Sequence, residues 1–342
     1  MSKYKIGYEK LNVEEKEAYR LFEKAFLSYA RVIDCGSISK DVDLLKVLRV
    51  ALNDNPQTYY FSTEKIEVCG SIFGDTRIRF REVYSLSKIK KMEKEMGMVL
   101  KEALEKILLL NPISNYDKLM CIYEYLQDNI EYDSMELEAR IRFGKIRNSV
   151  SYNAYGALVL KTAVCDGIAA AFSILAQHMG VRCSVIDGDA VSLNAELPYH
   201  AWNIINIRDK YYHADVTWDI GHKKQTGEYS YEYFCVTDDV INNDHNWNIN
   251  ETPACNSDEL SFYVRNKCYA NNLTQLEDIF RRYAKSKYPV VRVRISDKIE
   301  IPEPNDRYIV QCLEDISDTV GRTDGFQYMW NKDTRCFYAK YE

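Results

Sequence analysis

Apolar and polar positions alternate along the chain with two different periods, which separates expected helices from expected strands. A spacing of three to four residues predicts helices over residues 10–33, 44–52, 87–109, 116–129 and 165–179. Runs rich in aromatic and β-branched residues predict strands over residues 58–61, 65–69, 76–84, 200–207, 210–216 and 231–237. After residue 260 the pattern predicts a strand 261–265, a helix 274–286, a strand 290–296, a helix 305–320 and a hairpin 326–341. This intermixing indicates an α+β protein.

The helix expected after residue 164 begins with a cysteine. Its apolar positions lie on one face, and Gly180 ends the pattern as a C-terminal glycine does. Cys165 therefore stands at a helix N-terminus, where unpaired backbone N–H groups and the helix dipole favour a thiolate. We expect the pKa of Cys165 to lie below the value of about 8.5 of an unperturbed thiol.

A hairpin follows this helix and carries a histidine and an aspartate. Residues 200–207 and 210–216 are the two expected strands, joined by the short turn Arg208–Asp209. The start of the first strand lies beside the end of the second in such a hairpin, so His200 and Asp215 are expected to be neighbours. With the cysteine, they would form the nucleophile, base and orienting group of covalent acyl transfer.

Four separate segments resemble the core of the transglutaminase-like superfamily, a group related to papain. They are Tyr155–Leu158, Ala163–Gly167, His200–Asn203 and Tyr212–Asp219. The resemblance implies a papain-like fold in which the helix that bears the nucleophile packs on an antiparallel sheet. It also implies a catalytic triad in the order Cys, His, Asp, which falls on Cys165, His200 and Asp215.

Weaker matches extend this resemblance on both sides of the core, and the pattern is that of the bacterial members with several modules. The matching segments are Asp54–Pro56 with Tyr59–Phe61, Asp117–Leu126, Tyr132–Asp133, Tyr233–Asp238 and Asp244–Trp247. We therefore expect three parts: an N-terminal α+β module over residues 1–109, a catalytic core over 110–257, and a C-terminal α+β module over 258–342.

Further residues are candidates for the site around the triad. The backbone N–H of Cys165 is expected to form one half of an oxyanion hole, with Tyr155 as the second donor. Tyr199, Trp202 and Trp218 are expected to line the substrate cleft, although Trp202 fits core packing equally well.

Other polar residues are given structural roles. We expect His213 not to serve as a base, His178 and His222 to lie on the surface, and His245 to pack a loop. The charged stretch 132–150 fits a solvated surface loop better than a mobile lid. A metal site built from Cys165, Cys183, His200 and His213 lacks metal-type spacing, so no metal and no cofactor is expected.

Composition narrows the classes of protein to consider. The chain has 342 residues, 46% hydrophobic and 28% charged, with a net charge of −6. That charge argues against nucleic-acid binding, which needs a basic face. No segment reaches the roughly 20 apolar residues of a membrane span, so we expect no membrane partner.

The cysteines and the first residues bear on the compartment. Ten cysteines are spread without a CxxC pair, which is typical of reduced thiols. Residues 1–10 lack the apolar stretch of a secretion signal. A cytoplasmic location is expected, while a secreted protein whose leader is missing from this sequence stays open.

These features together predict a cysteine-dependent amide hydrolase that acts on a peptide or protein through a thioester. One alternative is a protein-glutamine transamidase, which differs only in its acyl acceptor. Another is a catalytically silent protein that binds a peptide or a cell-wall fragment. The sequence leaves the substrate and the oligomeric state open.

Overall fold

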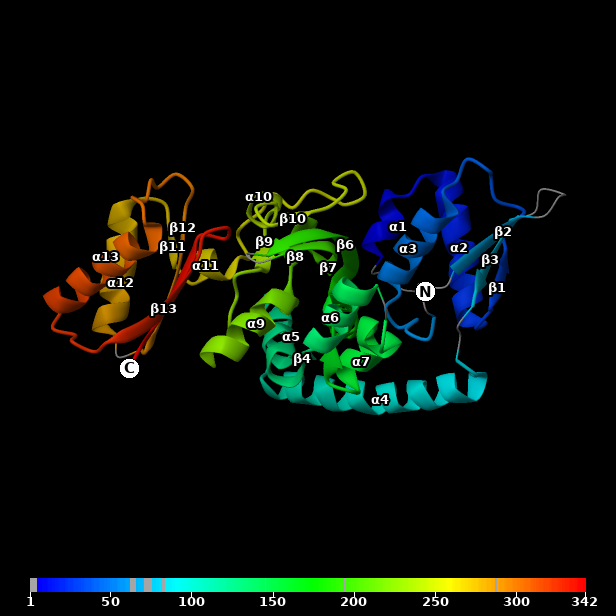
Figure 1. Cartoon of the computed structure of the whole chain (residues 1–342), viewed down its shortest axis with the longest axis horizontal. Helices are drawn as coiled ribbons and strands as arrows, with labels where there is room; N and C mark the ends of the chain where they lie inside the picture. Colours follow the sequence, from blue (N-terminus) through cyan, green and yellow to red (C-terminus); the bar gives the residue numbers. More distant parts are fainter. Residues whose placement is uncertain are drawn as a thin grey trace.

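The computed structural model describes residues 5–61, 66–70, 76–81, 84–144, 146–192, 195–286 and 288–342. For residues 192 and 195–198 it describes the main chain only. Figure 1 shows the N-terminal, middle and C-terminal parts of the chain side by side along the long axis of the molecule.

The N-terminal part packs three helices beside a small antiparallel sheet of order β1-β3-β2. Its elements are α1 (Ile6–Lys10), α2 (Val13–Leu27), β1 (Val32–Asp34), α3 (Leu44–Asp54), β2 (Ile66–Gly70) and β3 (Thr76–Phe80). Asn12 and Glu15 form a capping box at the start of α2. The strand expected over 58–61 is wrong, because residues 58–60 lie in turns; residue 65 of the next expected strand lies outside the described residues.

A long helix, α4 (Leu86–Leu109), leads from the N-terminal part to the middle. Figure 1 shows it along the lower edge of the molecule, beneath the central helices. It contacts α5 (Asn115–Asn129) and α7 (Ala154–Leu158) through an apolar stripe. One buried apolar cluster consequently runs from Leu11 to Leu260 and is shared by the N-terminal and middle parts.

The middle part is built on a five-stranded sheet of order β10-β6-β7-β8-β9, in which all neighbouring strands are antiparallel. The strands are β6 (Arg182–Ser192), β7 (Ala195–Ile207), β8 (Lys210–Ala214), β9 (Phe234–Val236) and β10 (His245–Asn246). Helix α8 (Cys165–His178) packs on β6 and β7. The expected arrangement, a helix that starts at the cysteine and rests on an antiparallel sheet, is confirmed.

Shorter elements complete the middle part. They are β4 (Glu131–Tyr132), α6 (Ser134–Phe143), the 3-10 helix η1 (Ser149–Tyr152), β5 (Thr162–Ala163), α9 (Val216–Thr226) and α10 (Asp238–Ile241). The stretch expected to be a solvated loop over 132–150 is instead largely helical. Glu136 is only 2% exposed and accepts hydrogen bonds from the backbone N–H groups of Arg147 and Asn148, which folds the segment back on itself.

The C-terminal part has its own buried cluster, which gathers residues between Tyr263 and Tyr341. Its elements are α11 (Phe262–Arg265), β11 (Tyr269–Ala270), α12 (Leu273–Lys285), β12 (Val290–Ile295), α13 (Asn305–Thr319), β13 (Phe326–Asn331) and β14 (Cys336–Tyr341). The sheet order is β11-β12-β14-β13. The expected strand over 261–265 is wrong, since these residues form a helical turn; the other elements expected here are present.

Several contacts join the C-terminal part to the middle part, among them Arg292 to the carbonyl of Tyr229 and Lys340 to Glu228, and the most buried of them gather at Glu232. The carboxylate of Glu232 accepts hydrogen bonds from Asn331 (2.8 Å) and Thr334 (3.0 Å) of the C-terminal part. The guanidinium of Arg294, which is 4% exposed, donates to the backbone carbonyl of the same glutamate. Three contacts therefore converge on one residue of the segment that precedes β9.

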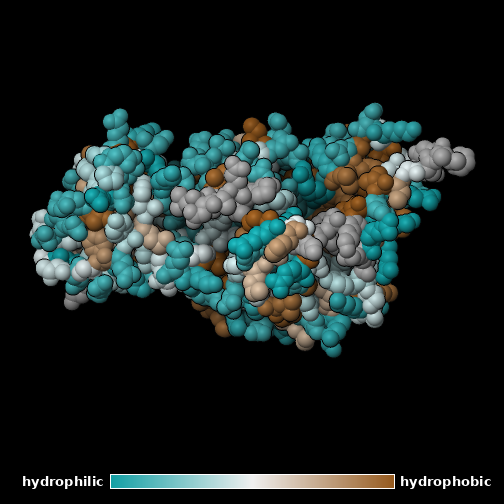
Figure 2. Space-filling model, viewed as in Figure 1, coloured by the Kyte–Doolittle hydropathy of each residue, from teal (hydrophilic) through white to brown (hydrophobic). Residues whose placement is uncertain are grey.

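The surface seen in Figure 2 is mostly hydrophilic, with apolar patches over the N-terminal part and the middle of the molecule. Among the described residues, no helix combines the length and the apolar character that crossing a bilayer would require.

Two glycines give a matched test of how tightly α8 is held. A Cβ at Gly167 would lie 2.6 Å from the carbonyl oxygen of Ser151, whereas a Cβ at Gly97 in α4 would meet nothing within 4 Å. We expect Gly167→Ala to lower the free energy of unfolding by about 1–3 kcal/mol through overpacking. Gly97→Ala should raise it by about 0.5–1 kcal/mol, because alanine loses less backbone entropy in a helix. Urea denaturation measures both, and equal effects would contradict this packing.

Candidate active site

The nucleophile candidate is the first residue of α8. The residue before it, Val164, offers no side-chain cap, so the N–H groups of the first turn are not taken by a capping side chain. Cys165 is 6% exposed, and its thiol lies 3.6 Å from a carboxylate oxygen of Asp166. The hydroxyl of Tyr199 donates to the other oxygen of Asp166 at 2.8 Å. The thiol is thus largely buried at the start of α8, next to the polar side chain of Asp166.

The electrostatic surroundings of the thiol differ from the expectation. Burial raises the pKa of Cys165 well above its ordinary value, and the carboxylates of Asp166 and Asp215 raise it further. The backbone N–H of Ala201 hydrogen-bonds the thiolate and acts in the opposite direction. The expected low pKa is therefore wrong, because burial and two nearby carboxylates outweigh the helix start. A base must take the proton when the sulfur reacts.

The thiol lies close to the strand that carries His200. The N–H that faces the sulfur belongs to Ala201, the residue after His200 in β7. Ala169 of α8 packs against Ala201, and the side chain of Asn203 donates to the carbonyl of Ala169 at 2.9 Å. Helix and strand are thereby held together at the level of the cysteine and the histidine.

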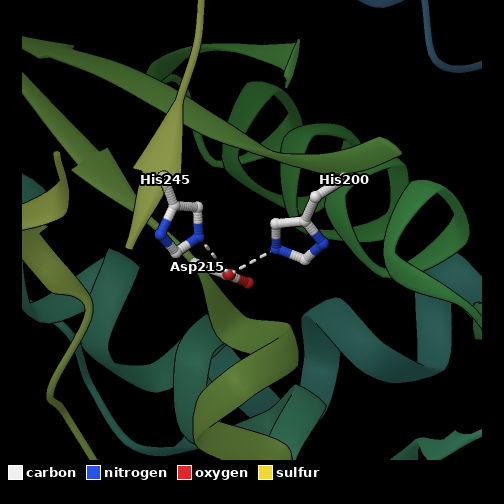
Figure 3. Close-up of side chains that lie close together, drawn as sticks. All are labelled: His200, Asp215 and His245. Atoms are coloured by element: carbon white, nitrogen blue, oxygen red, sulfur yellow. Dashed lines mark hydrogen bonds and ion pairs between the residues drawn. The ribbon is translucent and has the colours of Figure 1, made fainter. Parts of the chain in front are cut away.

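His200 and Asp215 form a buried pair, each 1% exposed. Nε2 of His200 lies 2.7 Å from Oδ2 of Asp215 (Figure 3). The Nδ1 side of the ring is then left for a second partner. Asp215 fixes one nitrogen of the imidazole, which is the role of the orienting group in a triad.

Asp215 occupies a helix cap and not the expected strand. The hairpin closes as predicted, with Ile207 opposite Lys210, and both turn residues have positive φ angles of 51° and 61°. The second strand ends at Ala214, however, and Asp215 caps α9 by accepting from the N–H of Thr217 at 2.8 Å. The chain turns at Asp215, so its carboxylate contacts His200 from the N-terminus of α9. The two residues are not paired across neighbouring strands, although the hairpin register predicted such a pair.

The carboxylate of Asp215 remains ionised despite its burial. Burial alone would raise its pKa, but the charge and hydrogen bond of His200, together with the bond from His245, hold the pKa below its usual range. The helix N-terminus that it caps also favours a negative charge.

Sequence reasoning missed His245, which was expected to pack a loop. His245 begins β10, and its Nε2 lies 3.1 Å from the same Oδ2 of Asp215 that His200 contacts. Figure 3 shows the two imidazoles on opposite sides of the carboxylate. The other ring nitrogen of His245 lies 2.5 Å from Asp244. The signal in the sequence was the segment Asp244–Trp247, which was noted only as part of the resemblance.

The residues expected to line a cleft fall into two groups. Trp202 is fully buried, stacks with His200 at 5.9 Å between ring centroids, and donates through Nε1 to His213 at 3.0 Å. It is a core residue behind the base, so its expected place in the cleft wall is wrong. Trp218 is half-buried with its ring 5.8 Å from that of His200, and Tyr199 is 40% exposed. These two can border an opening.

Tyr155 was expected to help form the oxyanion hole, and its contacts do not support that role. Its hydroxyl donates to Glu95 of α4, and its ring packs on Tyr59. Tyr132 lies in β4. Burial raises the pKa of Tyr132, and the charges of Cys165, Asp166 and Asp215 raise it further. Its strand pairs with β5, two residues before the cysteine.

Within the part of the chain that the structure describes, two groups of side chains could hold a metal ion by distance alone. His200, Asp215 and His245 form one group, and His213, Asp238 and Cys255 form the other; in each, the ligand atoms lie within 4.8 Å of one another. Hydrogen bonds already account for both arrangements. In the second, Nδ1 of His213 accepts from Trp202 and Nε2 lies 2.8 Å from Asp238, so both ring nitrogens are engaged.

Comparisons with known proteins give one family match and two similar solved structures. Residues 105–216 match the model of the transglutaminase-like superfamily. No curated protein sequence matches the chain. Two solved structures are similar to parts of it. A TGase shares 12% identity over 48% of this chain and 47% of its own, with a TM-score of 0.31. A candidate cysteine protease from Cytophaga hutchinsonii shares 14% identity over 45% of this chain and 61% of its own, with a TM-score of 0.27.

This chain therefore spans less than two thirds of either solved structure. The family match includes Cys165, His200 and Asp215 but ends before His245. On the family match and the α+β architecture, the chain contains a domain of the transglutaminase-like superfamily at residues 105–216.

Proposed function

We propose that this protein is a cysteine-dependent amide hydrolase that acts on a peptide or protein through a thioester. The observation that carries the proposal is the buried pair of His200 and Asp215, 2.7 Å apart, together with a cysteine at a helix start that the backbone N–H of Ala201, the residue after His200, hydrogen-bonds. A carboxylate that fixes one imidazole nitrogen leaves the other to serve as a base.

In the proposed reaction, the sulfur of Cys165 attacks the amide carbonyl while His200 takes the thiol proton. The carbon–nitrogen bond then breaks, and His200 returns that proton to the leaving amine. Water attacks the thioester with His200 again as base, which releases the acid and restores the thiol. Because the thiol is neutral at rest, removal of its proton by His200 belongs to the step in which the carbon–sulfur bond forms.

The oxyanion that forms during attack needs donors at the helix start. The backbone N–H of Cys165 is one candidate, since the first N–H groups of a helix have no partner within it. We assign the second role to the hydroxyl of Tyr132, which lies among the charges of Cys165, Asp166 and Asp215.

The two alternative functions each have one observation in their favour. Burial of the thiol at 6% exposure limits access of water, which favours an amine acceptor and thus transamidation. The raised pKa of Cys165 favours a silent binding protein, because a buried neutral thiol reacts slowly. A peptide or protein amide remains the proposed ligand in all three cases.

Thiol labelling separates an enzyme from a silent binder. All ten cysteines are free, and Cys69, Cys121 and Cys312 are half-buried thiols that serve as internal references. We expect iodoacetamide to modify Cys165 faster than these three in the wild type. In His200→Ala the rate at Cys165 alone should fall by about 10²–10⁴-fold, because the base is lost. Peptide mass mapping gives the rate for each cysteine; equal rates in both proteins would argue for the binder.

The acyl acceptor is identified by product analysis. Incubation with a glutamine peptide and a primary amine should yield mainly the deamidated peptide, measured by mass spectrometry, with Cys165→Ala as the inactive control. An amine adduct as the main product would replace hydrolysis by transamidation.

Two tyrosine variants test the assignment of the second oxyanion donor. Tyr132→Phe should lower kcat by about 10²–10³-fold with little change in KM, since the donor acts mainly in the transition state. Tyr155→Phe, which loses only the contact with Glu95, should leave kcat nearly unchanged. The reverse result would return the role to Tyr155.

A further inference from the structure

Asp215 is shared between two histidines, and only one of them belongs to the proposed triad. Its Oδ2 atom lies 2.7 Å from Nε2 of His200 and 3.1 Å from Nε2 of His245. Its Oδ1 atom accepts from the backbone of Thr217. Every contact of this carboxylate therefore comes from a fixed donor, and the second histidine supplies one of them.

His245 lies between two carboxylates. Nδ1 is 2.5 Å from Asp244 and Nε2 is 3.1 Å from Asp215. A neutral imidazole has one N–H and one lone pair, so one of its nitrogens would place a lone pair against a carboxylate oxygen. With both carboxylates ionised, both nitrogens must carry hydrogen, which makes His245 an imidazolium. Burial disfavours this charge, but the bonds to Asp215 and Asp244 outweigh it and raise the pKa of His245 to about 9.

The other groups that face His245 preserve this balance. The hydroxyl of Tyr233 donates to the second oxygen of Asp244 at 2.6 Å. His213 lies nearby, and burial lowers its pKa, so it adds no charge at neutral pH. The remaining neighbours are aromatic: the ring of Trp218 lies 4.6 Å and that of Trp202 5.0 Å from the imidazole of His245. Two carboxylates and one imidazolium thus present a single net negative charge to His200.

The backbone that carries His245 is held against the sheet at a glycine. His245 and Asn246 pair with Ala190 and Asp189 of β6. A Cβ at Gly188, which lies opposite His200 in the ladder, would come within 2.1 Å of the carbonyl oxygen of Asn246. Only a residue without a side chain lets β10 approach this closely. The pairing of β10 with β6 at Gly188 therefore fixes the backbone position of His245.

We propose that His245 is a positioning residue for the reaction, an imidazolium that fixes Asp215 and balances part of the negative charge that faces His200. This inference rests on the proposed function, since it concerns the base of that reaction. His245 contacts Asp215 and not the substrate, so it acts through the carboxylate.

The test replaces the imidazolium with a neutral side chain of similar reach. In His245→Gln the two carboxylates lose their counter-charge, so they should stabilise a positive charge beside them more strongly. We expect the acidic limb of the pH profile for iodoacetamide labelling of Cys165 to move up by about one pH unit. At a pH well below this limb, the labelling rate should fall by about tenfold. His178→Gln is the matched control: this ring lies at the far end of α8, 2.8 Å from the carbonyl oxygen of Ile174, and the substitution should leave the profile unchanged.

The labelling experiment also separates this inference from the proposed function. If labelling of Cys165 in the wild type does not depend on His200, the proposed enzyme fails. If it does depend on His200 while His245→Gln behaves like the His178 control, only the positioning role is overturned.

A direct measurement of the protonation of His245 needs no turnover. The chain has five histidines, which nitrogen-15 labelling makes visible by NMR. We expect one of them, assigned to His245 by its loss in the variant or by its shift in Asp244→Asn, to show two N–H groups at pH 7. It should lose one of them only near pH 9. A single N–H on His245 at pH 7 would overturn the proposal. A change of these signals on addition of EDTA would also overturn it, because it would indicate a bound metal ion.

Discussion

The buried carboxylate of Asp215 is the group on which the arrangement of the site depends. An ionised carboxylate without partners is costly to bury, so the fold must bring donors to it. These are His200 from β7, His245 from β10, and the backbone N–H of Thr217 at the start of α9. The sheet, its edge strand and the helix that follows it are thus tied together at one charge.

This charge also decides the chemistry that the cysteine can perform. A helix start by itself would favour a thiolate at Cys165. Burial and the nearby carboxylates instead raise the pKa of the Cys165 thiol. In the proposed reaction His200 would therefore take the proton as the sulfur attacks, as the base of a serine-type triad does.

Local patterns identified the reactive groups, because these stand at the ends of regular elements. The helix that starts at Cys165 and the hairpin that closes at Arg208–Asp209 are both encoded within short windows. The strand β6 was missed, since its residues mix small, polar and apolar side chains without clear alternation. His245 was missed for a related reason: β10 has only two residues, and its place is set by a partner strand more than fifty positions away.

The errors about environment share one cause, which is burial by distant parts of the chain. The pKa of the thiol, the interior position of Trp202 and the contact of Tyr155 with Glu95 all depend on which elements pack together. Periodicity shows which face of an element is apolar, but not how closely another element covers it. The charge state and the exposed fraction of a site residue therefore cannot be predicted from the sequence spacing of apolar residues alone.

The attachment of the C-terminal part at Glu232 bears on how such a protein can be divided or recombined. Glu232 directly precedes Tyr233, whose hydroxyl supports Asp244 and whose carbonyl accepts from the N–H of Asp215. Cutting the chain after residue 257 would remove Asn331 and Thr334, whose side chains donate hydrogen bonds to the buried carboxylate of Glu232. Glu232 would lose these donors next to Tyr233, the residue that contacts Asp215 and Asp244. A chimaera that replaces the C-terminal part must supply equivalent hydrogen-bond donors to Glu232. The C-terminal part, with its own buried cluster, therefore helps to support the candidate site and cannot be exchanged independently of it.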